Sequence, residues 1–224
     1  MTTRRSLMLA VFLTVAPFVW GPVAADPILD FTGGNAATPN VDTTIGWKFT
    51  VTSPITITAL GVFDSGADGL GQNHGIALWT GDGTSVLAST TITNANSTAV
   101  ASTSSLGNWR STTSMVNGAG AAISFVQLNP GDYVVGAFYA TNSPDKSVIN
   151  ATASTIAGVT WDEYRAALGS AFPNTFGGPA GNGFFGPNLF TATRPVPEPT
   201  SLILLGSGLA GLAGRLGWRK RKPK

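Results

Sequence analysis

Apolar residues alternate with small or polar residues through the central part of the chain, which is the pattern of half-buried β-strands. Turn residues separate these segments, because Gly81-Asp82-Gly83 is a hairpin signal and Asn129-Pro130-Gly131-Asp132 is a second turn. Such short strands at roughly ten-residue spacing predict a mainly β, antiparallel β-sandwich that is jelly-roll-like. The expected strands cover residues 45–51, 55–63, 76–80, 85–93, 122–128 and 133–140.

One segment departs from this pattern. Thr160-Trp161-Asp162-Glu163 is a capping box, with Thr160 as cap and Glu163 three residues later, and it predicts one short helix that ends near Leu168. The following stretch, residues 172–189, is rich in Gly, Pro, Asn and Phe. We expect it to close one end of the sandwich as an ordered loop or a short edge strand.

The N-terminal segment, residues 1–25, has the features of a signal peptide. Arg4 and Arg5 precede an apolar stretch over 7–15, and small residues at 23–25 follow a Pro- and Gly-containing break. A buried N-terminal helix is the alternative, but such a helix rarely begins with paired arginines and ends in Pro-rich small residues. The sequence predicts cleavage between Ala25 and Asp26.

The C-terminal segment predicts a membrane anchor. Residues 200–214 are uncharged and largely apolar, and a helix that continues to Trp218 would be about 28 Å long, which is enough to span the hydrocarbon layer. A basic cluster over 219–224 follows, and such clusters remain on the cytoplasmic side. The preceding domain would therefore face outward.

The order of elements at this end resembles the PEP-CTERM sorting signal of Gram-negative bacteria. Pro197-Glu198-Pro199, a short apolar helix and a terminal Arg/Lys cluster appear in that order. The resemblance implies processing by an exosortase-type enzyme, in strains that make exopolysaccharide. The expected organisation is a signal peptide (1–25), a β-sandwich ectodomain (26–194) and a sorting tail (195–224) with a transmembrane helix.

The central domain also resembles a bacterial domain of unknown function found in extracellular and carbohydrate-associated proteins. Four elements carry the resemblance: Gly46-Trp47-Lys48-Phe49, residues 57–63, His74-Gly75-Ile76-Ala77-Leu78-Trp79 with Gly83 and Leu87, and Pro130-Gly131-Asp132-Tyr133. It implies a sandwich-type module without an established chemistry.

Charge and cysteine content exclude several classes of function. Only 11% of the residues are charged, and the region from Asp26 to Glu198 holds five basic residues against all eleven acidic ones. That region therefore has no basic face for nucleic acid. The absence of Cys excludes disulfides and thiolate metal sites.

Two candidate sites involve loop residues. Asp64 and Asp68 lie in a Gly-rich turn and could supply some of the oxygen ligands of Ca²⁺, although an ordinary turn is the favoured interpretation. His74 is the only histidine, so neither an HExxH zinc site nor a histidine cage is possible. No GxSxG elbow occurs, and we expect His74 to be a hydrogen-bonding loop residue and the protein not to be an enzyme.

The tryptophans raise the question of carbohydrate binding, because sugars stack on exposed rings. Trp47 and Trp79 lie in expected strands and should fill the core. Trp109 and Trp161 are the candidates for exposed glycan contacts, with packing at the core or its edge as the favoured alternative.

These observations predict an exported protein of the cell envelope or extracellular matrix, either anchored in the membrane or released after the tail is processed. The leading hypothesis is a noncatalytic structural or interaction role linked to exopolysaccharide. The alternative is a carbohydrate-binding module that uses exposed aromatics. A hydrolase that pairs Asp162 with a second carboxylate is the weakest hypothesis, and two converging carboxylates in a cleft would support it.

Overall fold

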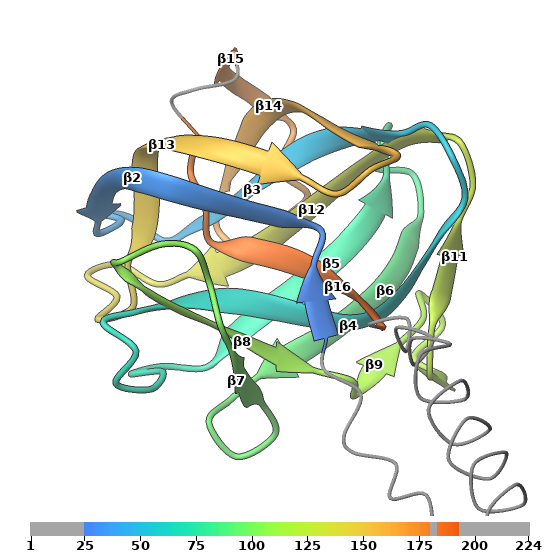
Figure 1. The fold of residues 1–224 in the computed structure, drawn as a ribbon. Coiled ribbons are helices and arrows are strands. Elements are labelled where there is room, and N and C mark those ends of the chain that lie inside the picture. Colours follow the sequence, from blue (N-terminus) through green and yellow to red (C-terminus); the bar gives the residue numbers. More distant parts are fainter. Residues whose placement is uncertain (1–24, 180–182, 193–224) are drawn as a thin grey trace, which may run out of the picture.

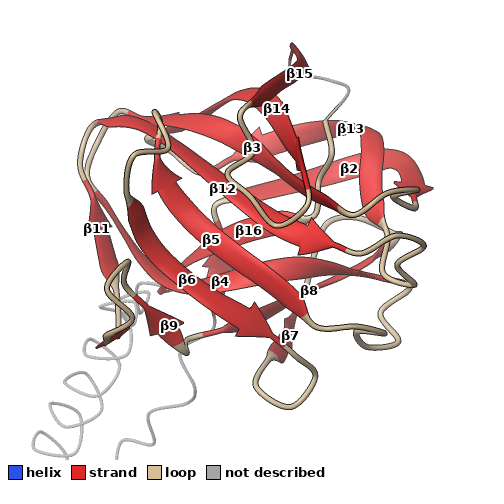
Figure 2. Ribbon diagram, turned by 180° about the vertical axis from the view of Figure 1, so that it is seen from behind, coloured by secondary structure: helices blue, strands red, loops and turns tan. Residues whose placement is uncertain are grey.

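The computed structural model describes residues 25–179 and 183–192. All regular elements in these ranges are β-strands, and every pair of neighbouring strands is antiparallel (Figures 1 and 2). The predicted mainly β, antiparallel architecture is therefore confirmed.

The strands form two large sheets and one strand pair. The smaller of the two large sheets has the order β1 (Ala25–Pro27), β16 (Pro187–Ala192), β4 (Ile55–Ser65), β8 (Gly107–Thr112), β7 (Thr98–Val100), and β11 (Val126–Leu128) also pairs with β4. The larger sheet has the order β10 (Ala122–Ile123), β9 (Met115–Val116), β6 (Val86–Ile92), β5 (His74–Thr80), β12 (Gly131–Tyr139), β3 (Thr43–Val51), β14 (Val159–Leu168), β15 (Thr175–Pro179). The separate pair consists of β2 (Leu29–Ala37) and β13 (Ser147–Thr155).

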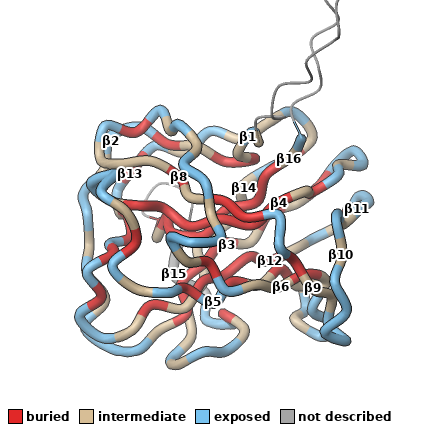
Figure 3. The backbone as a smooth tube through the Cα atoms, turned by 90° about the horizontal axis from the view of Figure 1, so that it is seen from below, coloured by how far each residue is buried: buried red, intermediate tan, exposed pale blue. Residues whose placement is uncertain are grey.

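The hydrophobic core lies between the two large sheets. β16 contacts β12 and β3 across the interior, and β4 contacts β5 and β6. Successive side chains of a strand point to opposite faces, so alternate residues of β3 enter the core, among them Trp47 and Phe49, which are fully buried. Figure 3 shows the buried positions in the interior of the molecule, with exposed positions mainly along the loops.

A cluster of aromatic rings joins the β2–β13 pair to the six-stranded sheet that contains β4 and β8. The ring of Phe31 lies 5.0 Å from that of Phe63 and 5.1 Å from that of Phe185, and Phe63 lies 5.2 Å from Trp109. Tilted and edge-to-face rings at such separations are favourable beyond their burial alone. The strand pair is therefore packed onto the same core.

Most of the strands predicted from alternation are present, but the helix expected over 160–168 is wrong. That segment is β14, which pairs with β3 on one side and β15 on the other. Pairing satisfies its backbone groups and buries β3, which outweighs the local helix signal. The stretch 172–189 contains the expected edge strand, β15, but its end also begins β16, an interior strand of its sheet.

Residues 1–24 of the expected signal peptide and the whole expected transmembrane helix lie outside the described residues, whereas Ala25, the last residue of the expected signal peptide, begins β1. In residues 25–179 and 183–192 there is no helix with the length and apolar character needed to cross a membrane. The two ends of the described fold are neighbours, because Ala25 of β1 pairs with Ala192 of β16. Every described strand lies between these two residues.

Candidate functional site

The structure places Trp109, a candidate for an exposed glycan contact, in the core, as the favoured alternative predicts. Trp109 lies on β8 and is fully buried, and its indole Nε1–H donates to Oδ1 of Asp30 at 3.1 Å. Its ring packs edge-on against Phe31 and Phe63. The polar residues around Trp109 in the sequence belong to the other face of β8, so Trp109 has no surface to offer a glycan.

Trp161 is partly buried and packs at the edge of the core. Its ring lies 5.3 Å from that of Phe185, and its indole nitrogen is buried without a hydrogen-bond partner among the described residues. Packing, the alternative favoured from the sequence, therefore describes both Trp109 and Trp161. Trp47 fills the core as expected, with Nε1–H donating to the Pro187 carbonyl at 2.9 Å.

His74 is the first residue of β5, not a loop residue, and it is fully buried. Its Nδ1 lies 2.9 Å from the carbonyl oxygen of Phe138, and its Nε2 lies 2.8 Å from Oδ2 of Asp145. A carbonyl and an ionised carboxylate can only accept, so both partners are satisfied when each ring nitrogen of His74 donates. His74 is thus a hydrogen-bonding residue, as expected, within an ion pair that the sequence did not reveal.

Asp145 also holds the loop that precedes His74. Its two oxygens accept from the backbone amides of Gly71 at 2.9 Å and Gln72 at 3.0 Å. Burial acts to raise the pKa of Asp145, but the hydrogen bonds from His74 and from the two amides outweigh it and lower the pKa below 3.8. This carboxylate therefore ties the loop before β5 to the segment that leads into β13.

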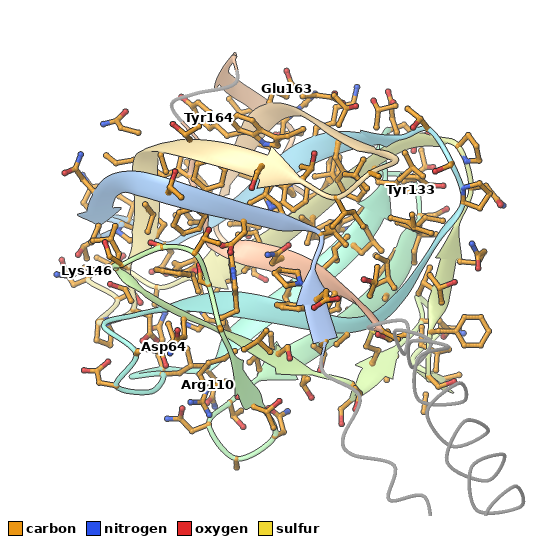
Figure 4. All side chains as sticks on the ribbon, viewed as in Figure 1. Asp64, Arg110, Tyr133, Lys146, Glu163 and Tyr164 are labelled. Carbon is orange, nitrogen blue, oxygen red and sulfur yellow. The ribbon has the colours of Figure 1, made fainter. Side chains whose placement is uncertain are left out.

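Asp64 and Asp68, the residues proposed for a cation, lie on either side of a tight turn. The Asp64 side chain is buried; its Oδ2 accepts from the Gly69 amide at 3.0 Å and lies 3.8 Å from Arg110 Nη1 (Figure 4). Burial raises the pKa of Asp64 and outweighs the hydrogen bond from Gly69 and the charge of Arg110, which lower it. Among the described residues there is no cluster of three or more His, Cys, Asp or Glu placed to hold a metal. The contacts of Asp64 are those of a turn stabilised by its own side chain.

Two carboxylates converge on the outer face of the larger sheet. Thr50 Oγ1 lies 2.9 Å from both Asp132 Oδ1 and Asp162 Oδ2, and Lys48 Nζ lies 2.8 Å from Asp132 Oδ2. Hydrogen bonds from Lys48 and Thr50 lower the pKa of Asp132, whereas burial raises that of Asp162. Opposite shifts are typical of acid–base pairs. However, the Asp132 side chain is half exposed. Neither Asp132 nor Asp162 lines the groove that opens on this face of the sheet, so the two carboxylates do not face a substrate-sized cleft there.

A groove with a volume of about 930 Å³ opens on the same outer face, next to this pair's sheet positions. Its floor comes from β5, β6 and β12, and its walls come from residues 113–116 with 122–123 on one side and residues 170–172 on the other. The floor includes small residues and aromatic rings: Gly75, Ala77, Trp79, Ser89, Gly136 and Phe138. The sequence-based expectation that Trp79 fills the core is wrong. Its neighbour Leu78 points into the core, and adjacent residues of a strand face opposite sides, so Trp79 faces the groove.

The described residues form an all-β fold, and the end of the chain gives a more specific result. Residues 195–222 match the PEP-CTERM protein-sorting motif. The motif implies an exported, envelope-associated protein that is sorted by an exosortase. No curated protein and no solved structure matches the chain.

Proposed function

We propose that the protein is a noncatalytic component of the cell envelope or extracellular matrix, held there through its association with neutral exopolysaccharide. The observation that carries this proposal is the combination of a PEP-CTERM motif with a sparsely charged β-domain before it. Thr, Ser and Asn side chains dominate the exposed loops and strand faces of that domain, and they supply neutral donors and acceptors.

Neutral polysaccharide suits such a surface because its hydroxyl groups can pair directly or through water with neutral side chains. Each contact is weak, so retention arises from many copies that engage one polymer together. Exosortase processing and a membrane anchor at residues 200–218 belong to the same proposal, because both would concentrate the domain at the cell surface. The transmembrane helix would hold the protein until the tail is cut.

Fractionation of the producing strain tests the proposal with the full chain. We expect the protein in the envelope and matrix fractions of the wild-type strain, and a shift to the soluble extracellular or periplasmic fraction in a strain that makes no exopolysaccharide. An unchanged distribution in the polysaccharide-free strain would refute the link to exopolysaccharide. A strain complemented for polysaccharide synthesis is the control.

The carboxylate pair at Asp132 and Asp162 favours a hydrolase as the second candidate. Hydrolysis requires both carboxyl groups to flank a bound substrate. Incubation of the ectodomain with the purified polysaccharide, followed by detection of new reducing ends, tests this candidate. If new reducing ends form with the wild type and not with Asp162→Asn, the hydrolase would replace the noncatalytic proposal.

A further inference from the structure

We propose that the groove on the outer face of the larger sheet is a binding site for a neutral glycan chain, with Trp79 and Phe172 as its apolar platform. This inference rests on the proposed function and assigns it to one surface. Figure 2 looks onto this face of the sheet, where β6, β5, β12 and β3 lie side by side.

The depth of the groove follows from strand parity and small residues. In β5, Ile76 and Leu78 point to the core, so Gly75, Ala77 and Trp79 point outward. A Cβ atom added at Gly75 would meet nothing within 4 Å, which shows open space directly above the strand. The floor is thus open above Gly75, whereas a Cβ atom added at Gly136 would meet Pro173 and Thr44 at 3.0 Å.

Two aromatic rings meet where the floor of the groove joins one of its walls. The rings of Trp79 and Phe172 meet edge to face, with centroids 5.6 Å apart and an interplanar angle of 70°. Both are half-buried, so each is partly covered by protein and partly open. Phe172 also covers Gly83, where an added Cβ would lie 2.5 Å from the ring, so the turn between β5 and β6 needs glycine there for packing as well as for its φ of 73°.

The wall that carries Phe172 is fixed before any ligand arrives. Thr44 Oγ1 on β3 donates to the Gly169 carbonyl at 2.7 Å and accepts from the Ala171 amide at 3.2 Å. The opposite wall is fixed by the turn at Asn117, whose Oδ1 accepts from the amides of Ala119 and Ala121 at 3.0 Å each. A preformed site loses little conformational entropy when a ligand binds.

The lining decides the class of ligand. None of the residues that line the groove is Asp, Glu, Lys, Arg or His, while several carry hydroxyl groups that no bond described above uses: Ser89, Thr91, Thr113 and Ser114. A charged glycan would lose hydration in the groove without gaining a counter-charge. A neutral sugar places its C–H face on a ring and its hydroxyl groups against hydroxyl side chains. The lining therefore complements an uncharged hexose chain better than an acidic glycan.

Titration of the ectodomain, residues 26–194, tests the site, because this range holds every described strand except for Ala25, the first residue of β1. The probes are neutral glucan and galactan oligosaccharides, with oligogalacturonate as the acidic counterpart, and binding is followed by calorimetry and by the NMR signal of the Trp79 indole. Gly75→Leu fills the open space without a strained φ and should abolish binding of the neutral probe. Trp79→Ala should weaken it about three- to tenfold.

Phe125→Ala is the matched control, because Phe125 is 57% exposed and does not line the groove. It should bind as the wild type does, and circular dichroism should show that all three variants are folded. Wild-type affinity in both Gly75→Leu and Trp79→Ala would overturn the groove as the site while leaving matrix association intact. Preference for oligogalacturonate, or no binding of any neutral probe, would overturn the neutral glycan as the ligand. Failure of the proposed function would appear separately, as an unchanged distribution of the protein in the polysaccharide-free strain.

Discussion

Nε2 of His74 lies 2.8 Å from Oδ2 of Asp145, and both side chains are buried. The pair connects the start of β5 to the loop that leads into β13, two segments far apart in the sequence. A buried ion pair is costly to break by removal of one partner, since the other charge then stays in the interior uncompensated.

We therefore expect His74→Ala to lower the free energy of unfolding by about 3–5 kcal/mol. Urea denaturation of the ectodomain measures this change. A double-mutant cycle with Asp145→Ala separates the interaction of the pair from the loss of either side chain, and a coupling energy near zero would show that the two residues act independently.

The pKa of Asp145 predicts the behaviour in acid. Its pKa is lower in the folded protein than its ordinary value of 3.8, so its contribution to stability is fully present above that value and is lost as the pH falls through the folded pKa. The stability difference between the wild type and Asp145→Asn should thus be constant above about pH 5 and shrink below pH 4. Thermal melts from pH 3 to 7 measure it, and a difference that grows in acid would contradict the sign.

Trp109→Ala should destabilise the fold and leave the intrinsic affinity for glycan unchanged. The substitution removes a fully buried ring and its hydrogen bond to Asp30, at a cost of about 3–5 kcal/mol. Trp109→Phe, which retains most of the ring volume, should cost less. A loss of affinity in folded Trp109→Phe, with an unchanged melting temperature, would instead place this ring at a binding surface.

Deletion of residues 197–224 should release the domain from the membrane. This segment contains the matched sorting motif and the apolar stretch 200–214. Immunoblots of membrane, periplasmic and medium fractions measure the release, with a Glu198→Gln variant as a test of the motif alone. Continued membrane association of the truncated protein would show that another region anchors it.

Strand alternation predicted the core sheet well because one face of each such strand is buried. β3, for example, sends Ile45, Trp47, Phe49 and Val51 inward, in the expected register. The strands of the peripheral pair were not predicted, since β2 carries Gly33 and Gly34 with positive φ and lacks a regular alternation. The sequence thus predicted the strands in which core-facing residues alternate with outward-facing ones, and not the strands that lack this alternation.

Pairing partners decided the segments that the sequence misassigned. Residues 160–168 have a local capping box, yet β3 offers a complete row of backbone partners that no local pattern reveals. The groove was missed for a related reason: its walls come from segments 113–123 and 170–172, which only the topology brings to one sheet face. His74 and Asp145, 71 positions apart, form a pair for the same reason.

The interior position of β16 has a consequence for how the exported chain reaches its final form. β16 lies between β1 and β4, although it is the last described strand, and the sorting motif begins at residue 195. Segments that emerge first from a translocating chain can fold first. The facing edges of β1 and β4 therefore stay unpaired until β16, next to the motif, has crossed the membrane. The sheet closes at about the time when the sorting signal itself is exported. Chains truncated before Pro187 would instead carry open strand edges into the envelope, where such edges promote aggregation.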